Sequence, residues 1–233
     1  MSFELPLPLA SLSSTDLLAC AVLLTLWWAT GFIVEHPPAS RISVSVLMAG
    51  YRREWMRQFV TRSPRIFDAN VIDSLRQGTA FFASACMIAI GGGVALIGNA
   101  AQLQGLAEDL TLNTESLVIE LKIILVLAFL ANALLKFIWA HRLFGYCSIL
   151  MAAVPNDPDH ALAYHRAEQA ADINITAAKS FNRGLRAIYF SLAALAWLVG
   201  PIALLAASLL AAGVLLRREF ASLSRKTMLR RDP

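Results

Sequence analysis

Four polar side chains interrupt the otherwise apolar stretch 117–140, namely Glu120, Lys122, Asn132 and Lys136. At roughly 100° per residue, Lys122, Asn132 and Lys136 share one side of a helix and Glu120 faces the other. A polar residue within a membrane span is a candidate for a solute path. Each lysine lies near one end of the stretch, where it can reach a polar layer, whereas Asn132 lies deep and asparagine often joins helices. A structural stripe and a translocation path both remain open.

A second polar group, Asn182, Arg183 and Arg186, directly precedes and enters the longest apolar run. Arg183 and Arg186 are three residues apart and therefore share a helix face. At the level of the lipid headgroups they could clamp a lipid phosphate, or bind another anionic ligand or partner. We treat these three residues, with Lys122, Asn132 and Lys136, as the candidate functional residues.

Motifs for catalysis or metal binding are missing from the sequence. There is no nucleophile elbow, phosphate loop, dinucleotide fingerprint or HExxH. His160 and His165 are five residues apart, which does not suit a helical metal pair. Cys20, Cys86 and Cys147 form no CxxC pair. We therefore predict no catalytic, cofactor-binding or metal site, and a protein that is not an enzyme.

The composition indicates an integral membrane protein. Of 233 residues, 58% are hydrophobic and only 15% are charged, with a mean hydropathy of +0.60. What remains outside the apolar runs is too short to build a separate core, so residues 1–233 form one membrane domain. The net charge of +4 comes from basic residues that flank the apolar runs. This distribution favours anionic lipid headgroups over nucleic acid as partners.

Four apolar runs, 17–34, 79–98, 117–140 and 185–216, predict an all-α protein with four transmembrane helices. The fourth run exceeds the roughly 20 residues that a bilayer needs. Gly200 and Pro201 lie near its middle and predict either a kink or a re-entrant turn. Segments 44–59 and 159–179 have the composition of surface helices on the cytoplasmic side. The first has a regular apolar stripe, which either lies in the membrane interface or packs against the transmembrane helices of the chain itself, and both readings remain open.

The basic residues predict the orientation. Segment 35–78 holds seven arginines and segment 141–186 holds five basic residues, which places both in the cytoplasm and the N-terminus outside. The tail after Leu216 holds six more. Four straight spans would export that tail, whereas a re-entrant fourth segment would return it. Straight spans are preferred because only the Gly-Pro pair offers a turn, and the side of the C-terminus stays open.

Two series of small residues at four-residue spacing predict close helix packing. The first is Ala85, Ala89 and Gly93, and the second is Ala203, Ala207 and Ala211. Such series let helices approach within the chain, in a homo-oligomer or in a larger membrane complex.

Several runs carry a family resemblance: FFASACMIAIGGG, ELK at 120–122, SFNRGLRAIYFSLAALAWLVGP and LLRREFAS. They resemble the bacterial and plant membrane family catalogued as domain of unknown function 599, from the first span to Ser222. The resemblance implies a polytopic membrane protein and brings no activity, substrate or site residue.

Our leading hypothesis is a non-enzymatic protein of the bacterial inner membrane that self-associates or serves as an accessory or assembly component of a membrane complex. The alternative is a channel or transporter for an ion or small solute. An enzyme acting on lipid is a third hypothesis.

Overall fold

The computed structural model describes residues 12–98 and 116–230, and within these ranges every regular element is a helix. In chain order these are α2 (Ser14–Glu35), α3 (Val44–Thr61), α4 (Ile66–Gly98), α6 (Ser116–Ala152), α7 (Ala163–Leu195), the short 3-10 helix η1 (Ala196–Leu198), α8 (Pro201–Phe220) and α9 (Leu223–Met228).

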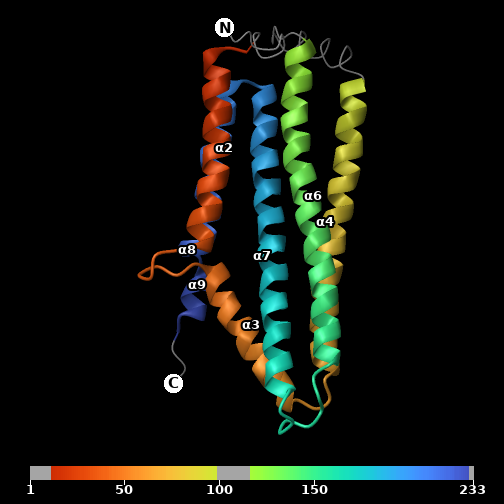
Figure 1. Cartoon of the computed structure of the whole chain (residues 1–233). Helices are drawn as coiled ribbons and strands as arrows, with labels where there is room; N and C mark the ends of the chain where they lie inside the picture. The colour runs from red at the N-terminus through yellow and green to blue at the C-terminus, as the bar shows by residue number, and fades with distance from the viewer. Residues whose placement is uncertain (1–11, 99–115, 231–233) are drawn as a thin grey trace, which may run out of the picture.

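The helices form one elongated bundle, with α3 crossing obliquely at its lower end (Figure 1). Four helices are long and apolar enough to cross a membrane, beginning at Ser14, Ile66, Val118 and Pro201. The predicted fold class, an all-α protein with four helices able to span a membrane, is confirmed, and the chain is a multi-pass membrane protein. The predicted runs 17–34 and 79–98 lie within α2 and α4. Run 117–140 lies within α6, which continues to Ala152.

The predicted fourth run, 185–216, is divided between two helices. Segment 163–195 is one continuous helix, α7, so the predicted surface segment 159–179 continues without a break into the first part of the predicted fourth run. The helix passes through η1 to Gly200, whose φ of 150° lies in the region that favours glycine. Pro201 then starts α8, at the position where its missing N–H costs no hydrogen bond.

The chain turns back at Gly200, which answers the question that the sequence left open. Just before the turn, Trp197 Nε1 donates to Asp16 Oδ1 at 2.7 Å, near the start of α2. At the other end of α8, Arg41, which follows α2, reaches the Phe220 carbonyl oxygen at 3.5 Å. Helix α8 therefore runs parallel to α2 and antiparallel to α7. The straight fourth span that the composition favoured does not form.

The return of α8 brings three basic segments into one half of the bundle. The loop after α2 with α3, the loop between α6 and α7, and α9 all lie in the lower half of Figure 1, away from the start of α2. Helix α3 is held there because Met56, Phe59 and Val60 are buried with apolar side chains of α6 and α7. The described part of the C-terminal tail thus lies in the same half of the bundle as the arginine-rich segments.

Helices α6 and α7 are in close contact at Gly184. A Cβ atom on this residue would lie 2.8 to 3.0 Å from three ring atoms of Phe137. The Phe137 ring is fully buried, and it contacts the rings of Phe82 at 5.3 Å and Phe181 at 5.4 Å between centroids. Glycine at this position is what allows α7 to pass over the ring.

Candidate functional site

One cavity brings together most of the candidate polar residues. It has a volume of about 360 Å³ and lies between α2, α6 and α7. Four of the six predicted residues line it: Asn132, Lys136, Arg183 and Arg186. We call this space the polar cavity. Its remaining lining comes from the C-terminal half of α2 and from His36.

Glu35, at the last position of α2, is the acidic residue of the polar cavity. It accepts hydrogen bonds from Arg183 Nε at 2.9 Å and Arg183 Nη2 at 2.5 Å, and Arg186 Nη2 also donates to it. The Arg186 side chain is 9% exposed and that of Arg183 is 47% exposed. Because a buried charge without a partner is costly, Glu35 is the residue that allows Arg186 to lie inside the bundle.

The charges in the polar cavity do not balance. Lys136, Arg183 and Arg186 contribute three positive charges and Glu35 one negative charge, which leaves two positive charges. Lys136 makes no hydrogen bond or ion pair in the part of the chain that the structure describes. A partly enclosed group of like charges concentrates ions of opposite sign. The arrangement is chemically suited to holding an anion.

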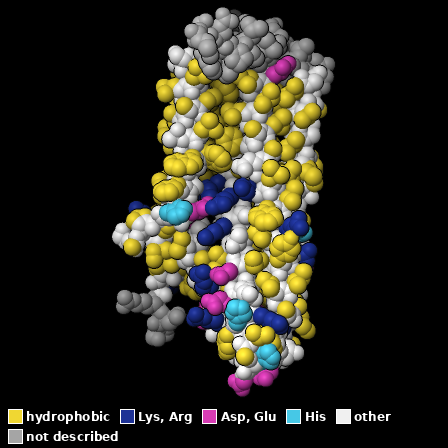
Figure 2. All heavy atoms as spheres, in the orientation of Figure 1, with side chains coloured by type: hydrophobic (Ala, Val, Ile, Leu, Met, Phe, Trp, Pro, Cys, Tyr) yellow, Lys and Arg dark blue, Asp and Glu magenta, His cyan; other side chains and the backbone are white. Residues whose placement is uncertain are grey.

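Aromatic side chains border the polar cavity. Trp27, Trp28 and Phe32 line it together with the charged residues. Trp28 is 66% exposed, and its ring stacks on Phe32 at 5.6 Å between centroids. Figure 2 shows basic and acidic side chains gathered part-way along this face, below a broad hydrophobic zone. Tryptophan beside charged groups at the edge of such a zone is typical of the headgroup layer.

The two remaining candidate residues lie elsewhere. Lys122 is buried near the opposite end of the bundle, with Nζ 5.8 Å from the centre of the Trp197 ring. Lys122 therefore does not share a cavity with Lys136, although both lysines project from the same side of α6. Asn182 donates to Ser45 Oγ at 3.4 Å and lines a different cavity.

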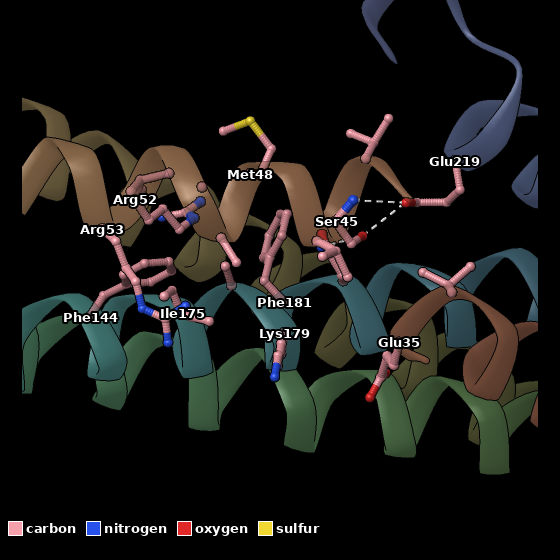
Figure 3. Close-up of a pocket in the computed structure, with 18 of the residues that line it drawn as sticks. Glu35, Ser45, Met48, Arg52, Arg53, Phe144, Ile175, Lys179, Phe181 and Glu219 are labelled. Atoms are coloured by element: carbon pink, nitrogen blue, oxygen red, sulfur yellow. Dashed lines mark hydrogen bonds between the residues drawn. The ribbon is translucent and has the colours of Figure 1, made fainter. Parts of the chain in front are cut away.

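This second cavity, of about 520 Å³, lies between α3, α4 and α7 (Figure 3). At one side, Arg52 donates to the Oδ1 atom of Asn174, which is fully buried. Burial lowers the pKa of Arg52, yet an arginine remains protonated. At the other side, Glu219 accepts from the Ser45 N–H at 2.9 Å and from Ser45 Oγ at 3.0 Å. The C-terminal end of α8 is thereby joined to the first turn of α3.

A family model described as a protein of unknown function, DUF599, matches residues 18–224. The chain belongs to this family. The match covers every residue that lines the polar cavity and confirms the resemblance inferred from the sequence. No curated protein and no solved structure matches the chain. The DUF599 family carries no assigned activity, so the residues themselves must carry the functional argument.

The two series of small residues in this DUF599 chain face different ways. In α8, Ala207 and Ala211 pack into the core cluster that includes Leu23 of α2. Ala203 of the same series is half-buried.

In α4, Gly93 abuts Leu127 of α6. Ala85 and Ala89 of that series instead lie on the exposed outer face of α4.

Among the described residues, no three His, Cys, Asp or Glu side chains come close enough to hold a metal ion. Sequence reasoning passed over Glu35, Arg52 and Glu219. Glu35 carried one usable signal, since it is the acidic residue that ends the first span, just before Pro37 and Pro38. Arg52 and Glu219 carried none, because only the packing of α3 against α7 and α8 gives them partners.

Proposed function

We propose that this protein is a non-enzymatic membrane protein that associates with a second copy of itself through the outer face of α4, and that it acts as an accessory or assembly component of a membrane complex. The observation that carries the proposal is the exposure of α4. Only 11% of the residues in the most apolar stretch of α4 are buried, whereas 39% of those in the corresponding stretch of α6 are buried. The outer side of α4 has no neighbouring helix within the described bundle.

The residue types on this face favour a helix as its neighbour. Ala85, Ala89 and Gly92 are exposed there and leave the backbone accessible. Phe81 and Ile88, 69% and 77% exposed, flank them and supply side chains that can pack against a partner. In a membrane, helices associate through close backbone approach rather than through a hydrophobic driving force, and small residues permit that approach.

The placement of basic residues supports the bacterial inner membrane, with the N-terminus outside and segments 35–78 and 141–186 in the cytoplasm. In the described part of the chain, α9 lies in the same lower half of Figure 1 as the loop after α2 and the loop between α6 and α7. A cytoplasmic location for these segments satisfies the excess of basic residues in all three.

The alternative, a channel or transporter, has less support. Lys122 and Lys136 lie in separate environments, and the side chains of Val126, Phe129 and Ala133 between them are buried and apolar. The described residues of α6 therefore offer no continuous polar path.

The test is disulfide cross-linking of single-cysteine variants in native membranes. We expect Ala89→Cys to form a dimer, and the matched control Leu209→Cys, on an exposed face of α8, not to do so. Ala85→Leu should weaken dimerisation in mild detergent, whereas Ala206→Leu on α8 should not. A wild-type protein that is strictly monomeric and purifies with no partner would refute the proposal.

A further inference from the structure

We propose that the polar cavity is a binding site for a phosphate group, held chiefly by Lys136 and Arg183 at the membrane surface. The inference is independent of self-association through α4, because none of its residues lies on that helix.

Lys136 is the first reason. Its side chain is half-buried against α2 and α7 and makes no hydrogen bond or ion pair in the described structure. The ammonium group of lysine carries three donors, and an acceptor within the cavity would satisfy them. Asn132, one helical turn earlier in α6, also lines the cavity and makes no side-chain hydrogen bond among the described residues.

The arginine pair is the second reason. Arg183 uses Nε and Nη2 to bind Glu35, which leaves its Nη1 donors free of any partner in the described structure. Because Glu35 holds this guanidinium in place, little side-chain entropy would be lost on binding a ligand. The oxygens of a tetrahedral phosphate can accept from an arginine and a lysine together, in charge-assisted bonds.

The charge count agrees with a phosphodiester. Two net positive charges remain in the polar cavity after Glu35 is counted, and a monoanionic phosphodiester would leave one. Trp27 and Trp28 border the same space, as expected where the acyl chains of a lipid meet its headgroup. A lipid headgroup and free phosphate share this chemistry, so the experiment has to separate them.

The experiment is native mass spectrometry of the full chain in non-ionic detergent, titrated with phosphatidylglycerol or phosphatidylcholine. We expect the wild type to prefer phosphatidylglycerol. Lys136→Gln should weaken its binding about tenfold, since it removes a hydrogen bond between charged groups. Arg142→Gln is the matched control, because Arg142 is an exposed cation of α6 outside the cavity.

Excess inorganic phosphate distinguishes the two sources. Displacement of the lipid by millimolar phosphate would support the site and assign it to the free anion, whereas retention would support it and assign it to the lipid. Lys136→Gln should leave the thermal stability unchanged, because the Lys136 side chain has no partner to lose. Equal weakening by Lys136→Gln and Arg142→Gln would overturn the proposal. So would a wild type that neither prefers phosphatidylglycerol nor binds phosphate.

Discussion

Replacing Gly184 with alanine should destabilise the bundle, because α6 and α7 touch there. The added Cβ would lie 2.8 to 3.0 Å from three atoms of the Phe137 ring. The ring cannot swing away, since it is fully buried beside Phe82 and Phe181. Inserting one carbon into a packed core costs about 1–3 kcal/mol. Alanine recovers about 1 kcal/mol of helix preference over glycine. The net loss is therefore up to about 2 kcal/mol.

Gly145→Ala is the matched control. Gly145 lies within α6, and a Cβ there would meet no atom within 4 Å. This variant gains the same helix preference without the contact, so it should be about 1–3 kcal/mol more stable than Gly184→Ala. Heating in detergent with a thiol-reactive dye measures the difference, because Cys86 and Cys147 are buried and react on unfolding. If Gly184→Ala melts at or above the temperature of Gly145→Ala, the inference that α6 and α7 are in tight contact at Gly184 is wrong.

Three further predictions test the turn, the lower end of the bundle and the topology. Gly200→Ala should cost about 1–3 kcal/mol, because φ is 150° there; Gly213→Ala, with open space around its Cβ, should cost nothing in the same dye assay. Trp55→Phe should cost about 1.5–3 kcal/mol, since it removes the 2.6 Å hydrogen bond from Trp55 Nε1 to the buried Asp68 carboxylate; an unchanged melting temperature would contradict this. A reporter fused after Pro233 should lie on the same side of the membrane as a reporter in the loop between α6 and α7, and on the side opposite a reporter at the N-terminus. If the reporter after Pro233 and the one in the α6–α7 loop lie on opposite sides, α8 does not cross back to the side of that loop.

The helices themselves could be predicted from the sequence, for a simple reason. A bilayer accepts only long apolar segments whose backbone groups are bonded internally, so each span must appear in the sequence as an apolar run. The run 17–34 lies within α2 and the run 79–98 lies within α4. Gly200 and Pro201 were also recognisable as a break, because their backbone properties are local.

The outcome of that break was decided by tertiary contacts. A kinked helix and a reversed chain have the same local sequence, so composition could not separate them. The reversed chain is held by Trp197, which meets Asp16 just before α8, and by Glu219, which binds Ser45 at the end of α8. These contacts join residues far apart in the chain. They also bring the basic tail to the half of the bundle where the charge count required it.

The candidate site was likewise predictable only in part from the sequence. The polar residues of α6 and α7 could be picked out from the sequence because charges are rare within or beside apolar runs. Spacing placed Lys122 and Lys136 on one side of α6, yet they are about 21 Å apart along the axis at the usual helical rise. Only the packing of α2 and α7 against α6 brings Lys136 to Arg183 and Glu35 and leaves Lys122 beside Trp197. The sequence by itself therefore determined which residues are polar within the bundle, and the tertiary structure decided which of them meet, because a contact between helices depends on the depth and direction of both.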